Sequence, residues 1–282
     1  MNSLSLRAYA KINLSLDITG IRDDGYHLLK TVMQSVDIYD TVTVNLNDSG
    51  IVKLSCTNKS VPVDNKNTAF KAAEKFFEYC NLKNGADIHI EKYIPSEAGM
   101  GGASADAAAV ITALNKLTNS MLSDEELLKI GLLVGADVPF CLTGGTALCQ
   151  GIGEKITPLC KLPECFIVIA KPEVGISTAK AYSEYDKNEK ADILYTDNLL
   201  LALENKNINQ IAKSTGNIFE LLVQCPEVEE IKHQMINSGA LSSCMTGSGS
   251  AVFGIFSDEE TAITCKNNLK DKYPFVSVTK AI

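Results

Sequence analysis

A glycine-rich turn runs directly into an alanine-rich, helix-forming segment in the stretch Pro95-Ser-Glu-Ala-Gly-Met-Gly-Gly-Ala-Ser-Ala-Asp-Ala-Ala-Ala109. Gly99, Gly101 and Gly102 allow positive φ angles and let a ligand approach the main chain closely. From Ser104 onward, the first turn of the helix would present unpaired N–H groups and the positive end of the helix dipole. Groups arranged in this way bind anions, most often nucleotide phosphates. The stretch therefore indicates a phosphate-handling enzyme.

The two familiar nucleotide-binding templates fit this loop poorly. A Walker loop needs Lys-Ser or Lys-Thr after its last glycine, whereas Gly102 is followed by Ala103 and Ser104. A dinucleotide fingerprint needs a third glycine at position 104, and none is there. A glycine-rich segment of this kind can also form a tight turn without binding anything. The other motifs in the chain must decide between these interpretations.

Composition and charge argue against several classes of protein. The chain has 282 residues, 45% of them hydrophobic and 21% charged, as in a globular protein with one large or two medium domains. No apolar run approaches the roughly 18 residues that cross a bilayer, and the first residues lack the layout of a signal peptide. We therefore expect a cytoplasmic protein that contacts no membrane. The net charge of −8 argues against nucleic-acid binding, which normally needs a basic face.

The cysteines and histidines do not suggest a metal centre. Nine cysteines are scattered along the chain without Cys-x-x-Cys spacing, and there are three histidines. This pattern argues against a disulfide framework and against a zinc site. We interpret the cysteines as reduced thiols that mostly fill the core.

Hydrophobic periodicity predicts both strands and helices along the chain. Residues 7–18 alternate strictly between apolar and polar side chains, as in a half-buried strand. Asn67–Tyr79 has helical periodicity with a capping residue at its start, and Ser123–Glu126 is a capping box that opens another helix. Phe166–Ala170 is a continuous apolar run, typical of a central strand. Gly144-Gly145 is expected to separate two short extended segments.

The order of these elements predicts an α+β protein with two lobes. The first half is rich in strands with interspersed helices, and the second half mixes helices with strands. A division after residue 158 gives an N-terminal lobe of residues 1–158 and a C-terminal lobe of residues 159–282. Two lobes of this kind usually hold their ligand in a cleft.

Two segments carry polar side chains suited to catalysis. Lys11 and Asn13 share the polar face of the strand at residues 7–18. A strand lysine is most often a solvated residue at an exposed edge, but asparagine is disfavoured in strands and suits a specific hydrogen bond. Asp137 follows a helix end in an apolar neighbourhood, where it could satisfy loop N–H groups or act as a base toward a hydroxyl. The residues alone leave both alternatives open.

Two loops offer further contacts to a ligand. Thr246-Gly-Ser-Gly-Ser250 lies between strand-like segments and could be a β-turn or a second backbone wall against a phosphate-bearing ligand. Tyr26-His27 follows a turn and offers an aromatic face beside a titratable ring. Aromatic pairs in loops more often serve packing than recognition. Each loop by itself is therefore weak support for a binding site.

Together these segments resemble the GHMP kinase superfamily, whose signatures are a strand with Lys and Asn, a glycine-rich phosphate loop and a late glycine-rich loop. The residues that carry the resemblance are Ala10-Lys-Ile-Asn-Leu14, Asp24-Gly-Tyr-His27, Gly99-Met-Gly-Gly-Ala-Ser104, Gly135-Ala-Asp-Val-Pro139 and Met245-Thr-Gly-Ser-Gly249. Further agreement in Gly144-Gly-Thr-Ala147 and Gly151-Ile-Gly-Glu154 extends the match over essentially the whole chain. The Asp24–His27 segment is typical of the members that act on a cytidine-diphosphate-linked methylerythritol, not on mevalonate, homoserine or galactose.

The resemblance implies a two-lobed fold, with a ribosomal-protein-like β-α-β topology in the N-terminal lobe and an α/β plait in the C-terminal lobe. It also implies phosphorylation of the 2-hydroxyl of that substrate by ATP with Mg²⁺. Asp137 would take the proton from the hydroxyl, and Lys11 would orient and polarise it. The ATP phosphates would lie against Pro95, Gly99, Met100, Gly101, Gly102, Ala103 and Ser104, with Ser104 near Mg²⁺ and Asn67 near the adenine.

The same resemblance places the substrate. Tyr26 would stack on the cytosine and His27 would match its polar edge, while Tyr182 would close the other face of the base. Asn13 would contact the methylerythritol. The phosphate-bearing end of the substrate would lie against Thr246, Gly247, Ser248 and Gly249.

Three positions depart from the pattern of the superfamily. Ala105 stands where a second serine is usual, so the task of binding phosphate falls on Ser104 and the backbone N–H groups. Glu97 is an acid close to the expected anion site, and it must point away or face the metal. Tyr9 stands where proline usually precedes the Ala-Lys pair, which changes the entry to the strand but not its Lys/Asn face.

Other functions remain open from the sequence. The chain could be another GHMP kinase, acting on mevalonate or homoserine, or a catalytically silent ligand sensor that kept the fold. The presence of Lys11, Ser104 and Asp137 argues against the sensor. A nucleic-acid-binding module with a related fold is disfavoured by the charge. Both a monomer and a homodimer are compatible with the sequence.

Overall fold

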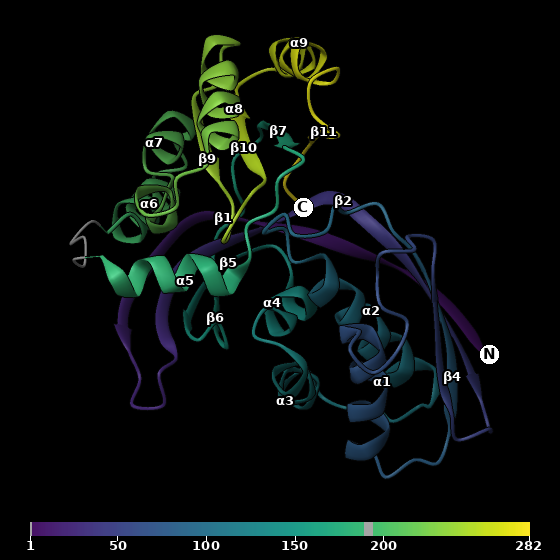
Figure 1. Cartoon of the computed structure of the whole chain (residues 1–282). Helices are drawn as coiled ribbons and strands as arrows, with labels where there is room; N and C mark the ends of the chain where they lie inside the picture. Colours follow the sequence, from purple (N-terminus) through teal and green to yellow (C-terminus); the bar gives the residue numbers. More distant parts are fainter. Residues whose placement is uncertain (1, 189–193) are drawn as a thin grey trace. The chain divides into compact units, whose positions relative to one another are not determined.

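The computed structural model describes residues 2–188 and 194–282 (Figure 1). Within these residues the strands form two sheets, of seven and four strands. The chain divides into two compact units that interleave along the sequence. Unit 1 comprises Met1–Ala10, Ile38–Ile94 and Gly101–Gly144, and unit 2 comprises Lys11–Asp37, Pro95–Met100 and Gly145–Ile282. The two long strands β1 (Ser3–Ile21) and β2 (His27–Asn47) are each divided between the units.

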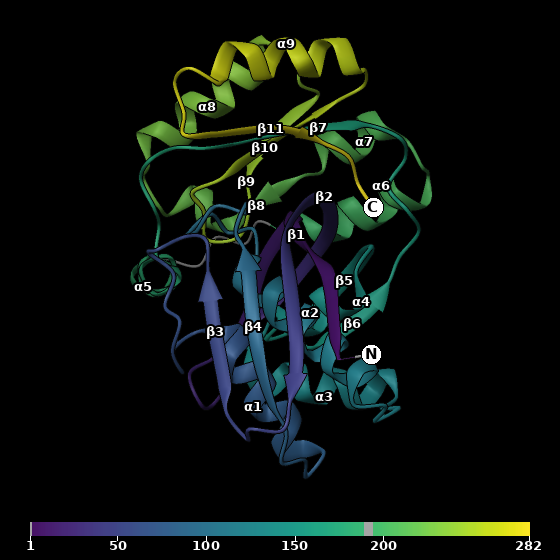
Figure 2. The same ribbon diagram turned by 90° about the vertical axis from the view of Figure 1, so that its right-hand side faces the viewer.

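Unit 1 packs helices against a small group of strands. Besides parts of β1 and β2, it contains β3 (Val52–Cys56), α1 (Thr68–Tyr79), β4 (Gly85–Glu91), α2 (Gly102–Leu117), α3 (Asp124–Val134) and α4 (Val138–Thr143). Strand β4 pairs parallel to β3 and antiparallel to residues 41–47 of β2. Helices α1 and α2 lie behind β3 and β4 in Figure 2.

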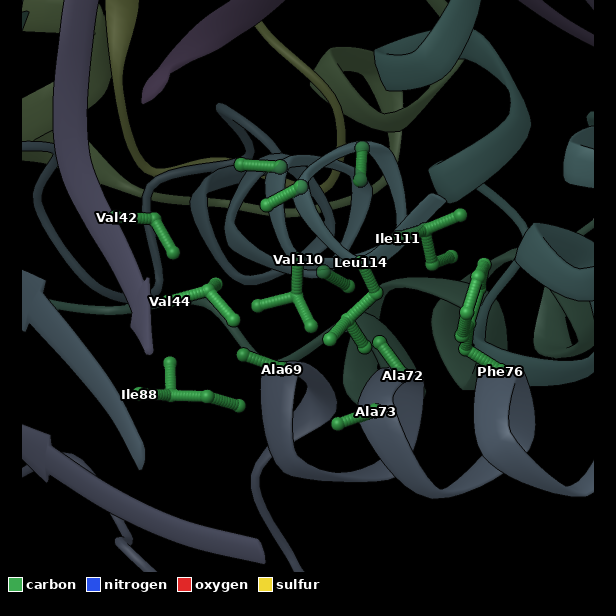
Figure 3. Close-up of a cluster of buried hydrophobic side chains, with 14 of the residues drawn as sticks. Val42, Val44, Ala69, Ala72, Ala73, Phe76, Ile88, Val110, Ile111 and Leu114 are labelled. Atoms are coloured by element: carbon green, nitrogen blue, oxygen red, sulfur yellow. The ribbon is translucent and has the colours of Figure 1, made fainter. Parts of the chain in front are cut away.

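The core of unit 1 fills the space between these strands and helices. Figure 3 shows strand residues such as Val44 and Ile88 facing Ala69 and Ala73 of α1 and Val110 of α2. Alanines dominate the contact faces of both helices, and their small side chains let α1 and α2 approach each other and the sheet closely. Each apolar side chain that is removed from water stabilises the unit. The gain is roughly 25 cal/mol for each Å² of apolar surface that is buried. The second half of the alanine-rich stretch is therefore a core element as well as the continuation of the glycine loop.

Unit 2 contains a four-stranded antiparallel sheet in the order β11-β7-β10-β9. Its elements, besides parts of β1 and β2, are β5 (Thr146–Gly151), β6 (Lys155–Pro158), β7 (Phe166–Lys171), α5 (Thr178–Lys187), α6 (Thr196–Glu204), α7 (Ile208–Lys213), β8 (Gly216–Asn217), the 3₁₀ helix η1 (Ile218–Leu221), α8 (Pro226–Asn237), β9 (Ser242–Met245), β10 (Val252–Phe256), α9 (Glu259–Leu269) and β11 (Phe275–Thr279). Helices α8 and α9 lie over this sheet in Figure 2. Residues 29–34 of β2 pair antiparallel with β5, and Ser15-Leu16 of β1 pairs parallel with β8.

Most of the local structure expected from the sequence is confirmed. Asn67 caps α1, Ser123 and Glu126 form the capping box of α3, and β7 is an interior strand of its sheet. The expectation for Gly144-Gly145 is wrong in one respect: the segment before the glycines is helix α4, and only the segment after them is extended. Pro139 lies at the start of α4, where its missing N–H is not needed, and this favours a helix over a strand.

None of the helices in the described part of the chain is both long and apolar enough to span a membrane.

Candidate functional site

The glycine loop adopts the conformation that its glycines predict. Gly99 has φ 71° and Gly101 has φ 69°, and α2 begins at Gly102. Within the described residues no side chain caps this helix, because Gly101 occupies the capping position. The N–H groups of the first turn, which includes Ser104, are therefore available to an external acceptor. Ala105, which stands where the superfamily usually has a second serine, is buried. Its N–H donates to the carbonyl of Gly101 at 2.9 Å, as in a regular helix.

The first half of the glycine loop is tied to the β9–β10 hairpin of unit 2. The N–H of Ala251 donates to the carbonyl of Ala98 at 3.2 Å, and the hydroxyl of Thr246 donates to the carbonyl of Gly99 at 3.3 Å. The N–H of Lys11 donates to the carbonyl of Met100 at 3.0 Å. The structure thus brings three of the predicted site segments together: the loop before residue 101, the Lys11 strand and the Thr246 loop.

Replacing Gly99 by alanine is expected to destabilise the protein by about 1–3 kcal/mol. A Cβ atom at this position would lie 2.0 Å from the carbonyl oxygen of Thr246, so the backbone of one loop would have to move. Gly145→Ala is the matched control, because Gly145 has φ 73° and no atom within 4 Å of its added Cβ. Urea denaturation should show a clearly larger loss for Gly99→Ala. Equal losses for the two variants would mean that the close contact with Thr246 does not matter.

Lys11 and Asn13 form a buried hydrogen-bond network. Lys11 Nζ donates to Asn13 Oδ1 at 2.7 Å, and Asn13 Nδ2 donates to the hydroxyl of Thr31 at 2.8 Å. The N–H of Asn13 donates to the hydroxyl of Thr246 at 2.9 Å. Because Lys11 is only 4% exposed, it is not a solvated lysine at a sheet edge. This burial favours the interpretation in which Lys11 and Asn13 serve a specific polar task.

Asn217 is a residue of this region that the sequence interpretation missed. It is fully buried in unit 2, and its Nδ2 donates to the carbonyls of Met245 and Gly247, each at 2.8 Å. These two bonds fix the backbone on both sides of Thr246. A lone asparagine in a two-residue strand gives no signal in the sequence, because its partners are 28 and 30 positions away.

Two of the predicted base-recognition residues, His27 and Tyr182, are in contact within unit 2. The ring of His27 stacks on the ring of Tyr182 with their centroids 4.6 Å apart and an interplanar angle of 27°. His27 Nε2 lies 2.7 Å from Asp186 Oδ1 of α5. Tyr26 is 61% exposed, so its ring is open to a ligand. The hydroxyls of Thr178, near the start of α5, and Ser248 lie 3.1 Å apart.

Asp137 lies in unit 1 at the residue before α4. Its carbonyl accepts from the N–H of Cys141 at 3.1 Å, but its carboxylate makes no capping bond to the first turn of α4. Its side chain is half-buried. The simple turn-stabilising alternative therefore receives no support from α4.

Asn67 is engaged in local structure. Its Oδ1 accepts from the N–H of Ala69 at 2.8 Å and its Nδ2 donates to the carbonyl of Pro62 at 2.7 Å, so it caps α1 and ties down the preceding loop. A place near adenine stays a prediction for this residue. Removing it would affect the start of α1 whatever else it contacts.

The side chain of Glu97 lies against Gly175, another residue of unit 2. A Cβ atom on Gly175 would lie 2.4 Å from Glu97 Oε2, so the glutamate side chain rests directly on this glycine. Burial lowers the pKa of Lys171, and the charge of Glu97 opposes this. Glu97 of the glycine loop thus lies against a glycine and interacts electrostatically with Lys171.

A buried group of three charged residues flanks the glycine loop in unit 1, and the sequence interpretation did not include it. Lys92 Nζ donates to a carboxylate oxygen of Asp40 and, at 2.8 Å, to Asp106 Oδ2. Asp40 Oδ1 also accepts from the N–H of Ile94 at 2.8 Å, just before the loop begins. The other oxygen of Asp106 has no hydrogen-bond partner among the described residues. The signal for this group in the sequence was Asp106, an aspartate within an alanine-rich helix.

The electrostatics of this group follow from its burial. Burial raises the pKa of Asp106 to about 7, although Lys92 opposes the rise. Burial alone would lower the pKa of Lys92, but the charges of Asp106 and Asp40 raise it above its ordinary value. Two carboxylates thus share one ammonium group in an environment with little water. Lys92 thus links two segments: Asp40, which binds the backbone just before the glycine loop, and Asp106, in the second turn of α2.

Protein side chains alone do not form a metal centre in the described residues. No group of three or more His, Cys, Asp or Glu side chains in residues 2–188 and 194–282 is arranged to hold an ion. Ser104, in the first turn of α2, has a hydroxyl and a neighbouring uncapped helix terminus. This donor set fits a metal that arrives with phosphate oxygens, since Mg²⁺ is commonly bound by few protein oxygens together with substrate phosphates.

Comparison with known proteins shows the family to which the chain belongs. The model for the GHMP kinases N terminal domain matches residues 67–145, and the model for the GHMP kinases C terminal domain matches residues 199–274. A 4-diphosphocytidyl-2-C-methyl-D-erythritol kinase of Clostridium tetani is 44% identical over 281 residues, which cover 99% of this chain and 100% of the relative.

Solved structures agree with this similarity. The crystal structure of a 4-(cytidine 5'-diphospho)-2C-methyl-D-erythritol kinase is 29% identical, with a TM-score of 0.81 and 99% of each chain covered. Homoserine kinase from Cytophaga hutchinsonii has a TM-score of 0.78 at 21% identity, with 100% of this chain and 95% of that chain covered, and shares the fold. The α+β fold expected from the sequence is thus confirmed. This chain belongs to the GHMP kinases and, within them, to the 4-diphosphocytidyl-2-C-methyl-D-erythritol kinases.

Proposed function

We propose that this chain transfers the terminal phosphoryl group of ATP to the 2-hydroxyl of 4-diphosphocytidyl-2-C-methyl-D-erythritol, a step of non-mevalonate isoprenoid biosynthesis. The observation that carries this proposal is the 44% identity to a named kinase of this substrate over essentially the whole chain. The alternatives among the GHMP kinases lack comparable support, since the homoserine kinase neighbour shares the fold at only 21% identity. As a member of this family the chain is an ATP-dependent enzyme, which argues against a silent sensor.

The phosphates of ATP are assigned to the glycine loop. The uncapped first turn of α2 offers backbone N–H groups and a helix dipole to anionic oxygens. Positive φ angles at Gly99 and Gly101 shape the approach to that turn, with Pro95, Met100, Gly102 and Ala103 completing the loop. When Mg²⁺ is bound, it neutralises charge on the phosphates, and Ser104 is its proposed protein ligand. Asn67 is proposed to lie near the adenine.

Phosphoryl transfer needs positioning and charge neutralisation more than covalent chemistry. Lys11 is proposed to orient the acceptor hydroxyl and to offset developing negative charge, because its ammonium group is buried and held by Asn13. Asp137 is proposed to accept the hydroxyl proton. Asn13 is proposed to contact the methylerythritol, and residues 246–249 the phosphate-bearing end of the substrate.

The cytosine is assigned to Tyr26, His27 and Tyr182. The exposed ring of Tyr26 is proposed to stack on the base, while the His27 ring matches its polar edge. Tyr182 stacks on His27. We propose that Tyr182 contacts the base next to this pair of rings.

The organisation of the whole protein is proposed on the same grounds. We place an N-terminal ATP-binding lobe at residues 1–158 and a C-terminal lobe at residues 159–282. The enzyme is proposed to act in the cytoplasm on a small molecule, as a monomer or homodimer, without binding nucleic acid or membrane.

A substrate panel tests the proposal. ADP release should be measured with cytidine-diphosphate-linked methylerythritol, mevalonate and homoserine under identical conditions. We expect kcat/KM to favour the cytidine-linked substrate by about 10³-fold or more, because the others lack the base that polar groups of the site recognise. Comparable or faster turnover of mevalonate or homoserine would contradict the proposal.

A further inference from the structure

His27 is held by an acid that no motif of the sequence includes. Its Nε2 lies 2.7 Å from Asp186 Oδ1, and its side chain is 11% exposed while that of Asp186 is 50% exposed. Asp186 is on α5, 159 positions further along the chain. The contact therefore adds an acid to the helix that already carries Tyr182, another residue of the expected base site.

Aromatic rings fix the orientation of the same imidazole. The His27 ring stacks on Tyr182, and the ring of Tyr185 meets it edge-on with centroids 5.5 Å apart and an interplanar angle of 85°. Tyr182 is in turn packed edge-on against Phe219, with centroids 5.1 Å apart. Tilting the imidazole out of this plane would break the stacking, and a 180° flip within the plane would break the contact of Nε2 with Asp186. One ring edge thus faces α5, and the other nitrogen, Nδ1, has no hydrogen-bond partner among the described residues.

The acid determines which nitrogen carries the proton of a neutral imidazole. An ionised carboxylate only accepts hydrogen bonds, so Nε2 must donate and must carry hydrogen. The other nitrogen of a neutral ring then has a lone pair and acts as an acceptor. An acceptor at Nδ1 suits a ligand that offers N–H. It is repelled by a carbonyl oxygen in the same place.

We propose that Asp186 is a positioning residue that fixes the tautomer of His27, so that Nδ1 accepts a hydrogen bond from the exocyclic amino group of the substrate's base. The proposal rests on the proposed function, in which that base is cytosine. Uracil differs at this edge by carrying a carbonyl oxygen in place of the amino group. Asp186 therefore determines the preference for a cytidine-linked over a uridine-linked substrate without touching either one.

The tautomer can be measured without any substrate. Nitrogen-15 NMR distinguishes protonated from unprotonated ring nitrogens, and with three histidines in the chain the signals can be assigned by single substitutions. At pH 8 the wild type should show His27 with hydrogen on Nε2 and a bare Nδ1. Asp186→Ala should shift His27 toward a mixture of the two tautomers. A wild-type signal with hydrogen on Nδ1 would overturn the proposal.

The specificity should change with the tautomer. In Asp186→Ala the ratio of kcat/KM for the cytidine-linked substrate to that for its uridine-linked analogue should fall about tenfold, mainly through KM, because one hydrogen bond is at stake. Asp186→Glu should restore much of the ratio. Glu184→Ala is the matched control, since it removes an acid of the same helix that is paired with Lys187 instead of His27.

The outcomes separate this inference from the function on which it rests. A wild type that fails to phosphorylate the cytidine-linked substrate would overturn the proposed function, whatever the tautomer. A wild type that is active, together with an Asp186→Ala variant of unchanged base preference, would overturn the role of Asp186 alone. Equal changes in Asp186→Ala and Glu184→Ala would assign the effect to the charge of α5 and would also overturn it.

Discussion

Replacing Asp137 by asparagine is expected to lower kcat by about 10²–10⁴-fold, which is the usual contribution of a general base. The amide keeps the size of the side chain but cannot take a proton from the substrate hydroxyl. The carboxylate makes no capping bond to α4, so its replacement should leave the start of that helix intact. Steady-state kinetics with saturating ATP and cytidine-linked substrate measure the effect, and KM for both substrates should change little.

Two further measurements make this result interpretable. Isothermal titration with a non-hydrolysable ATP analogue should give the same affinity for Asp137→Asn and for the wild type, because the glycine loop proposed to bind the phosphates is unchanged. Asp124→Asn is the matched control, since Asp124 lies in the first turn of α3. It should keep full kcat. A kcat within about fivefold of the wild type in Asp137→Asn would refute the proton-accepting role, given that a base contributes at least about 10²-fold.

Local chemistry made several features predictable from the sequence. The positive φ angles of Gly99 and Gly101, the cap at Asn67 and the capping box at Ser123 each depend on residues close together in the chain. The strand with Lys11 and Asn13 was predictable because apolar and polar side chains alternate along it. What alternation could not show is that its polar face is buried, because this depends on Thr246, which is 233 positions away from Asn13.

The features that the sequence did not reveal are long-range polar contacts. Asp40, Lys92 and Asp106 each look like ordinary charged residues in their own segments, and only the fold joins them. The pair of His27 and Asp186 is hidden for the same reason. Glu97 was an unresolved conflict in the sequence because its partner surface, at Gly175, belongs to a different segment of the chain. Periodicity reports which face of an element is buried, but not which polar groups meet there.

The pair Gly144-Gly145 illustrates a different limit of prediction from the sequence. A pair of glycines is compatible with a turn between strands or with the end of a helix, since both require unusual φ angles. The short α4 has only six residues, too few for a helical period to be visible in the sequence. Its proline near the start was the better signal, because proline favours the first turn of a helix.

Replacing Lys92 by methionine is expected to lower the free energy of unfolding at pH 8 by about 3–5 kcal/mol, the usual cost of breaking a buried ion pair from one side. Methionine retains most of the length of the side chain, so packing changes little. The carboxylates of Asp40 and Asp106, which are 0% and 4% exposed, then lose the ammonium group that they share. Urea denaturation followed by circular dichroism measures the loss. Lys129→Met, which breaks the exposed pair with Glu125, is the control and should have little effect.

The pH dependence of this loss separates charge from packing. The pKa of Asp106 is raised from its ordinary value of 3.8 to about 7, mainly by burial. A carboxyl group with a higher pKa in the folded state binds its proton more tightly when folded, so its contribution to stability is present at low pH and is lost as the pH rises toward 7. Because Lys92 opposes that rise, its removal should raise the pKa further. The loss caused by Lys92→Met should therefore be smaller at pH 5, where the carboxyl is protonated, than at pH 8. Adding Asp106→Asn should recover part of the loss at pH 8, whereas a loss that is independent of pH and unaffected by Asp106→Asn would mean that the lysine stabilises this region by packing alone.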